Sequence, residues 1–275
     1  MEEIIKELSK DNKKYRVLLV MLIFLLLFVN YEFLNDELSK LLTDSEYALV
    51  TRVIDGDTLE LEDGERVRLL GINTPEKGEA YYNEAKELLE NLTLNKTVRV
   101  EFGKKKYDLY DRTLAYIFVE NTPEQDVFVN VKIVEQGFAN LYFPESQKLH
   151  YAEFAEAWES CLEKNQNLCE KSLAKCAPCI ELKQLNYNSQ KVVFENICNF
   201  SCDLNDWKIK DEGRKNFIFD DFFLNSNSEV SIIVGNKTDT KDILYWKKET
   251  YVWTESGDSL FLRDSAGKLV LWESY

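Results

Sequence analysis

The alternation of apolar and polar residues between residues 47 and 164 predicts a small sheet with helices around it. Alternating segments rich in β-branched residues predict five strands, at 49–54, 58–61, 66–70, 97–102 and 113–119. The pairs Asp55-Gly56 and Asp63-Gly64 mark tight turns between the first three strands. Helical spacing of apolar residues predicts helices over 79–92, about 127–135 and about 145–162. Short strands with helices packed around them predict an α+β domain built on an OB-fold barrel.

From residue 180 onward, the pattern changes to short strands separated by Asn, Asp and Gly turns. The predicted strands are 180–185, 192–195, 207–210, 217–219, 231–234, 259–263 and 269–272. So many short strands in succession predict an all-β, immunoglobulin-like sandwich over 180–275. Residues 165–179, which are rich in cysteine, lysine and asparagine, are expected to form a linker between the two domains.

The N-terminal segment carries an unbroken apolar run at 17–29, extended by aromatic residues to 34. No small-residue cleavage pattern follows it, which favours a transmembrane signal anchor at 17–34 over a cleaved signal peptide or a buried core helix. Lysines and an arginine precede the run and acidic residues follow it, so the positive-inside rule predicts a cytoplasmic tail at 1–16. We therefore expect a single-pass protein of the cell membrane, with a linker at 35–46 and both later domains extracytoplasmic.

Composition narrows the possible chemistry. The formal net charge of −15 over 275 residues argues against a protein that packages nucleic acid through counterion release. It leaves room for an enzyme that binds nucleic acid transiently through a metal ion and a local basic patch. Because the chain has one histidine, His150, mechanisms built on histidine pairs or histidine–metal clusters are nearly excluded.

Three short segments, 53–58, 68–76 and 108–116, together carry the groups needed to hydrolyse a phosphodiester without histidine. Asp57, Asn73 and Thr74 offer oxygen ligands, which are the ligands that Ca²⁺ takes. Considered alone, Asp55 and Asp57 would be an ordinary pair of turn aspartates. The arginines and the glutamate in the neighbouring segments favour a catalytic interpretation.

These three segments resemble the thermonuclease (staphylococcal nuclease) family, and the resemblance spans roughly 47–164. It implies an OB-fold and a bound Ca²⁺. In this family Asp57 would be a direct ligand, Thr74 would offer its backbone carbonyl, and Asp55 would support the ligands. Asn73 takes the place of the family's second acidic ligand, so one negative charge is lost and metal affinity should fall.

The resemblance also implies the catalytic and substrate-binding residues. Glu76 corresponds to the candidate general base, and Arg68 and Arg112 correspond to arginines that clamp the phosphate through their planar guanidinium groups. Tyr110 matches a tyrosine that contacts a terminal phosphate, and Tyr142 lies near a tyrosine that stacks on a base. Stacking tolerates any base, so low sequence specificity is expected. A core position for Tyr142 is the alternative.

The C-terminal segment resembles the lamin-tail domain in 193–211, 251–260 and 264–269. This resemblance implies a binding or positioning module of unknown ligand, without chemistry of its own. Trp207 and Trp253 are expected in its core.

Six cysteines in an extracytoplasmic protein predict disulfides, with Cys161 and Cys169 as a local pair. The alternative is a structural Zn²⁺ site at Cys176, Cys179, Cys198 and Cys202. Both interpretations require Cys179 to lie close to Cys198.

The sequence as a whole predicts a membrane-anchored, calcium-dependent endonuclease that hydrolyses DNA or RNA with low sequence specificity. The alternative is a catalytically inactive surface protein that binds nucleic acid or serves as an adhesion or scaffold protein.

Overall fold

The computed structural model describes residues 15, 18–22, 26, 45–122, 125–143 and 149–275. Most of the predicted tail, anchor and first linker lies outside these residues. Within the described part, the structure contains no helix with the length and apolar content that a membrane span requires. Residues 45–275 form one compact unit, which contains both predicted domains.

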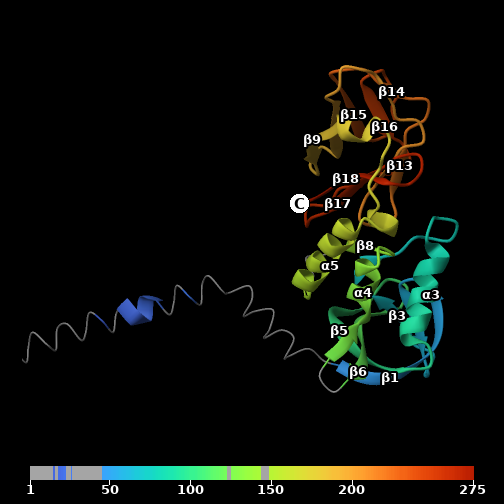
Figure 1. Cartoon of the computed structure of the whole chain (residues 1–275), viewed down its shortest axis with the longest axis vertical. Helices are drawn as coiled ribbons and strands as arrows, with labels where there is room; N and C mark the ends of the chain where they lie inside the picture. Colours follow the sequence, from blue (N-terminus) through green and yellow to red (C-terminus); the bar gives the residue numbers. More distant parts are fainter. Residues whose placement is uncertain (1–14, 16–17, 23–25, 27–44, 123–124, 144–148) are drawn as a thin grey trace, which may run out of the picture. The chain divides into compact units, whose positions relative to one another are not determined.

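The first domain, called the barrel domain below (residues 45–164), is built on a closed antiparallel sheet with one parallel pair (Figure 1). Its strand order is β3-β2-β1-β5-β6, and β3 returns to pair in parallel with β6 and closes the barrel; β7 extends the sheet from β6. The bounds are β1 Ser45–Asp55, β2 Thr58–Leu61, β3 Arg66–Leu69, β5 Thr97–Tyr107, β6 Thr113–Thr122 and β7 Gln125–Phe128.

Alternation explains why these segments form a barrel, because every second side chain enters the core. In β5, Val98, Val100 and Phe102 are buried, and the intervening residues are less so, apart from Glu101. Glu101 is buried against His150, whose Nε2 lies 2.7 Å from the Glu101 carboxylate. The single histidine is thus a structural residue of the barrel domain.

The remaining elements among the described residues of the barrel domain are three helices and a short two-stranded sheet. Their bounds are β4 Gly71–Asn73, α3 Tyr82–Thr93, α4 Val129–Glu135, β8 Asn140–Tyr142 and α5 Tyr151–Lys164. β4 and β8 pair antiparallel, with Gly71 opposite Tyr142 and Asn73 opposite Asn140. The α+β composition is as predicted, but residues 127–128, predicted as helix, are the end of β7.

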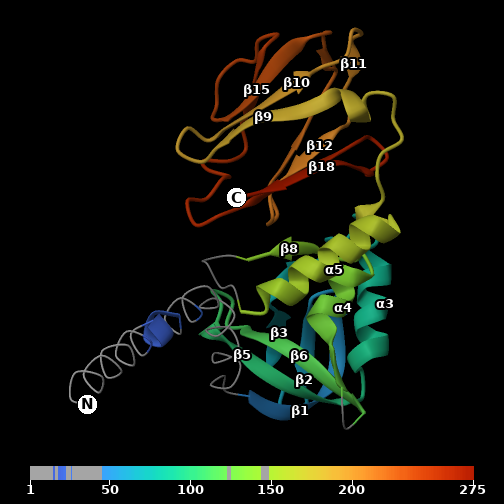
Figure 2. The same cartoon turned by 60° about the vertical axis from the view of Figure 1, so that its left-hand side comes forward.

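The second domain, called the sandwich domain below (residues 180–275), consists of two four-stranded sheets (Figure 2). One has the order β16-β15-β10-β9 and the other β13-β12-β17-β18, with β11 and β14 paired beside them. Its bounds are β9 Ile180–Asn186, β10 Lys191–Asn196, β11 Cys202–Asp203, β12 Lys208–Lys210, β13 Asn216–Ile218, β14 Phe223–Leu224, β15 Ser228–Val234, β16 Ile243–Trp246, β17 Ser259–Arg263 and β18 Leu269–Ser274. Trp207 and Trp253 are buried in the core of this domain, as predicted.

Strand β17 joins the two domains because it is buried on both faces. Leu260 and Leu262 enter the core of the sandwich domain, whereas Phe261 between them belongs to the core of the barrel domain. The Phe261 ring lies 5.8 Å from that of Trp158 on α5. Figure 2 shows α5 running between the barrel and the β12–β18 sheet. The hydrophobic core therefore continues from one domain into the other.

All six cysteines form disulfides. The pairs are Cys161–Cys169, Cys176–Cys202 and Cys179–Cys198, with Cα–Cα distances of 5.8, 5.6 and 5.3 Å. The local pair Cys161–Cys169 and the proximity of Cys179 to Cys198 are confirmed. The zinc alternative is wrong, because its four sulfurs are used in disulfides. The segment 165–179 is an ordered part of the fold, held by these bridges, by η2 Asn167–Cys169 and by η3 Ala177–Cys179.

Candidate active site

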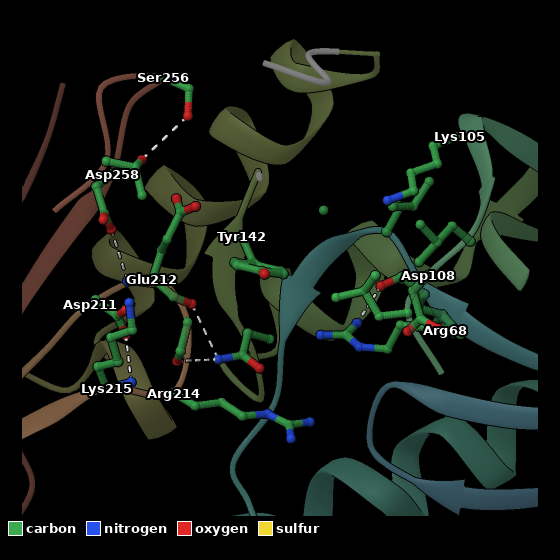
Figure 3. Close-up of a pocket in the computed structure, with 18 of the residues that line it drawn as sticks. Arg68, Lys105, Asp108, Tyr142, Asp211, Glu212, Arg214, Lys215, Ser256 and Asp258 are labelled. Carbon is green, nitrogen blue, oxygen red and sulfur yellow. Dashed lines mark hydrogen bonds between the residues drawn. The ribbon is translucent and has the colours of Figure 1, made fainter. Parts of the chain in front are cut away.

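A cavity of about 610 Å³ lies between the barrel domain and the sandwich domain. Figure 3 shows Arg68, Lys105 and Asp108 on one side, Asp211, Lys215 and Asp258 of the sandwich domain on the other, and Tyr142 between them. Four of the predicted site residues besides Asn73 line this cavity, namely Arg68, Tyr110, Arg112 and Tyr142. Residues far apart in sequence thus meet at one opening.

Asp57 lies beside the cavity at the turn that connects β1 and β2. Asp55 caps this turn, since its Oδ1 accepts a hydrogen bond from the Asp57 backbone N–H at 3.1 Å. Gly56 is required there, because a Cβ would lie 2.7 Å from the Ala85 side chain and 2.9 Å from Thr74 Oγ1. Burial, followed by the neighbouring Asp57 charge, raises the pKa of Asp55. The turn therefore packs tightly against the Thr74 segment, which brings the predicted ligands together.

The Asp57 carboxylate is buried and well supplied with donors. Its Oδ2 accepts hydrogen bonds from the Thr74 backbone N–H and hydroxyl, each at 3.0 Å, and lies 3.2 Å from Arg68 Nη2. Its Oδ1 accepts from the Thr58 hydroxyl at 3.2 Å. A buried carboxylate needs such partners, and the Arg68 cation compensates its charge.

Arg68 is held by the barrel domain as well as facing the cavity. Its Nη2 donates to the Ile72 carbonyl at 2.8 Å, and its Nη1 donates to the Leu69 carbonyl. Its guanidinium carbon lies 5.9 Å from the centre of the Tyr142 ring. Arg68 is only 6% exposed, so its guanidinium is fixed in place.

Arg112 is held by Asp108, which lies in the same loop between β5 and β6. Its Nε and Nη2 lie 2.8 and 2.7 Å from Asp108 Oδ2, and its backbone N–H donates to Asp108 Oδ1 at 3.0 Å. Burial opposes ionisation of Asp108, but hydrogen bonds from the Arg112 and Tyr110 backbones lower the pKa of this carboxyl. Tyr110 is largely exposed beside it, with the Arg112 guanidinium carbon 5.5 Å from the ring centre. The loop presents a cation and an aromatic ring side by side.

Asn73 and Glu76 contact the sandwich domain, which the sequence did not predict. The Asn73 amide nitrogen donates to the carbonyls of Gly213 at 2.7 Å and Glu212 at 3.2 Å. Glu76 Oε1 lies 2.8 Å from Arg214 Nε. The contacting residues form the turn between β12 and β13. The pattern of that segment marks a polar turn with a glycine, and nothing in it indicates which surface the turn meets.

The side of the cavity formed by the sandwich domain is rich in carboxyl groups. Burial, followed by the charge of Asp258, raises the pKa of Asp211 to about 7 and that of Glu212 to about 8. Burial also raises the pKa of Asp258 to about 6, against hydrogen bonds from the backbone of Glu212 and Ser259. Protonation at neutral pH therefore reduces the negative charge of this side.

The oxygen atoms of the predicted ligands are of the kind that bind a calcium ion. Asp57 would supply a carboxylate, Thr74 a backbone carbonyl and Asn73 an amide oxygen, and Ca²⁺ takes oxygen ligands. The two carbonyls that accept from the Asn73 nitrogen fix which amide atom is the donor, so its oxygen is directed away from the turn. With a single carboxylate in this set, water and substrate phosphate would complete the usual six to eight ligands.

Comparison with known proteins agrees with the arrangement of the two domains. The family model described as staphylococcal nuclease homologue matches residues 66–171, and the model for the lamin tail domain matches residues 177–275. A thermonuclease of Staphylococcus intermedius is 34% identical over 136 residues, covering 46% of this chain and 77% of the relative. A thermonuclease of Staphylococcus hyicus is 33% identical over 127 residues, covering 42% of this chain and 72% of the relative.

A micrococcal nuclease of Shigella flexneri is also similar, with 33% identity over 100 residues, 34% of this chain and 56% of the relative. The residues matched by the staphylococcal nuclease homologue model include Arg68, the Asn73–Glu76 segment and Arg112, which lie at or beside the cavity. The chain therefore belongs to the staphylococcal nuclease homologue family and carries a lamin tail domain after its nuclease domain.

Proposed function

We propose that this phosphodiesterase is a calcium-dependent nuclease that cleaves DNA or RNA with low sequence specificity at the cavity described above. The observation that carries the proposal is the joint placement of Arg68 and Arg112 on one cavity, with the oxygens of Asp57, Asn73 and Thr74 beside it. Strand order supports an OB-type barrel and an immunoglobulin-like sandwich as the two folds.

The two arginines are proposed to bind the scissile phosphate. A guanidinium donates parallel hydrogen bonds to phosphate oxygens, and both guanidinium groups are held in place before substrate arrives. Asp108 uses Nε and Nη2 of Arg112, so Nη1 remains for a phosphate. In Arg68, the bonds to Asp57, Leu69 and Ile72 use both hydrogens of Nη2 and one of Nη1. Its Nε–H and the second Nη1–H remain for a phosphate.

Glu76 is proposed to accept a proton from, or orient, the attacking water. Its side chain is half exposed, so water reaches it, and one of its oxygens faces Arg214. Calcium, when bound at Asp57, Asn73 and Thr74, would supply positive charge that neutralises the phosphate oxygens. The protein's own contribution is to orient the phosphate, the water and these ligands relative to one another.

Tyr110 and Tyr142 are proposed to contact the substrate around the scissile phosphate. Both line the cavity, and Tyr142 lies in β8 rather than in the core of the barrel. Aromatic faces stack on any base, which supports low sequence specificity.

We also propose an extracytoplasmic location behind an anchor at residues 17–34. The apolar run and the flanking charges support the anchor. Three disulfides support an oxidising compartment, because such bonds persist there and are rare in the cytosol.

The direct test of this proposal is release of acid-soluble nucleotide from denatured DNA and from RNA by the full chain, at millimolar Ca²⁺ and with a chelator. We expect release that depends on calcium. A folded protein that releases no nucleotide from either substrate at millimolar calcium would favour the inactive, nucleic-acid-binding alternative.

A further inference from the structure

The turn between β12 and β13, residues 211–215, makes two direct contacts with the proposed active site. Its main-chain carbonyls accept two hydrogen bonds from the Asn73 amide, and its Arg214 lies 2.8 Å from the Glu76 carboxylate. A third contact lies next to these, since Lys210 Nζ is 3.5 Å from Glu79 Oε2, and Glu79 in turn accepts from the Glu76 backbone N–H at 2.9 Å.

The turn is itself held firmly within the sandwich domain. Asp211 Oδ1 accepts from the Lys215 N–H at 2.9 Å, and the Asp211 N–H donates to the Lys215 carbonyl at 3.1 Å. Asp258 Oδ1 accepts from the Glu212 N–H at 3.3 Å. A turn closed at its base and tied to a neighbouring loop presents Arg214 from a defined position.

The sandwich domain is also fixed to the barrel domain away from this turn. Arg263 is buried and donates to the Leu168 carbonyl at 2.6 Å and to Asn140 Oδ1 at 3.2 Å. Together with the Trp158–Phe261 contact, these bonds hold β17 against the barrel domain and the 165–179 segment. The turn therefore meets the active site as part of one compact unit.

We propose that Arg214 is a positioning residue for Glu76 and that the lamin tail domain is thereby an integral part of the nuclease active site. This inference rests on the proposed function of Glu76. A half-exposed glutamate on its own samples several rotamers, and an ion pair to an arginine carried on a fixed turn favours one of them. Arg214 contacts Glu76 through Nε, and its side chain also lines the cavity.

The asparagine at position 73 fits the same inference. An amide donates to the carbonyls of Glu212 and Gly213, whereas an aspartate would place a carboxylate against two carbonyl oxygens. The loss of one acidic ligand is thus explained by docking of the second domain against the site.

Arg214→Ala in the full chain tests the inference. Arg214→Lys serves as the conservative variant and Arg66→Ala as the control. Arg66 is a matched control, because it is equally exposed, pairs with Glu60 at 3.7 Å and does not line the cavity. The readouts are kcat and KM for denatured DNA at saturating calcium, the melting temperature without calcium, and hydrogen–deuterium exchange of residues 73–82 without calcium.

We expect Arg214→Ala to lower kcat by about tenfold or more with little change in KM, because misplacement of a reacting group slows the chemical step. Exchange in 73–82 should accelerate. The melting temperature should stay close to that of the parent, since an exposed ion pair contributes little to stability. Arg214→Lys should recover part of kcat, and Arg66→Ala should match the parent.

Two results would overturn the inference in an active parent enzyme. Unchanged kcat in Arg214→Ala would show that Glu76 does not depend on the turn. An increase in kcat would show that the ion pair blocks Glu76 instead of positioning it. A parent without calcium-dependent activity would instead count against the proposed function itself.

Discussion

Asn73 illustrates how one residue serves two domains. From the sequence alone, Asn73→Asp is expected to lower the calcium requirement, because it restores a negative ligand. The structure adds a cost, since the amide nitrogen donates to two carbonyls of the lamin tail domain. A carboxylate has no donor for them and would repel both.

We predict that Asn73→Asp lowers the free energy of unfolding without calcium by roughly 1–3 kcal/mol, the usual cost of leaving buried polar groups without partners. Urea denaturation in the presence of a chelator measures it. Addition of calcium should recover part of the loss if the new carboxylate becomes a ligand. A variant as stable as the parent in the chelator would show that these two hydrogen bonds contribute nothing.

At the same scale, the sequence predicts residue types better than their partners. The spacing of the family's motifs predicts that Arg68, Arg112 and Asp57 belong to one site, and all three lie at or beside one cavity. The partners of Glu76 and Asn73 could not, because Arg214 and Gly213 lie more than a hundred residues away in a turn of ordinary polar composition.

At the scale of elements, long alternating strands were predictable and very short ones were not. β11 and β14 have two residues each, which is too short for any period to show. The last two residues of β7 are predicted as helix, because Val127 and Phe128 continue into the apolar spacing of α4. The turn between β12 and β13 was visible as a turn, but its role depends on tertiary contacts.

The buried carboxyl groups in and next to that turn make the stability of the protein depend on pH. Asp211 and Asp258 have pKa values of about 7 and 6, above the ordinary 3.8, because both are buried and Asp258 repels Asp211. The charge of Asp211 in turn raises the pKa of Glu212, while Lys215 favours ionisation of both aspartates. Because the folded-state pKa values are raised, the protonated aspartates stabilise the folded protein fully below about pH 4. This stabilisation is lost as the pH rises through 6–7.

Asp258→Asn should therefore raise the free energy of unfolding above that of the parent at pH 8. The gain over the parent should be smaller at pH 5. The amide oxygen keeps the acceptor for the backbone of Glu212 and Ser259 and removes the charge. Urea denaturation at both pH values measures it, with Asp242→Asn as an exposed control. An equal difference from the parent at both pH values would contradict the assignment.

At the scale of the whole molecule, the two domains share one hydrophobic core. Phe261 from β17 packs edge-on against Trp158 of α5, and Trp272 of β18 lies 5.6 Å from the same ring. The sequence predicts β17 and α5 separately, but it gives no sign that they face each other. Unfolding of the two domains should therefore be coupled.

Phe261→Ala should destabilise both domains together, by about 3–5 kcal/mol for removal of a fully buried phenylalanine. Calorimetry, with intrinsic fluorescence in parallel, should show one transition in the parent and one at lower temperature in the variant. The exposed Phe223→Ala serves as a control. Two separate transitions, with only one shifted, would mean that the domains fold independently.

The central claim is that the cavity between the domains hydrolyses phosphodiesters, and Arg112→Ala tests it most directly. The rate of calcium-dependent release of nucleotide from denatured DNA should be compared among the parent, Arg112→Ala and Arg66→Ala. Removing one preorganised donor typically lowers the rate by about 10²–10³, so Arg112→Ala should fall on that scale while Arg66→Ala stays near the parent. Cleavage by folded Arg112→Ala at the parental rate would contradict the assignment of this cavity as the active site.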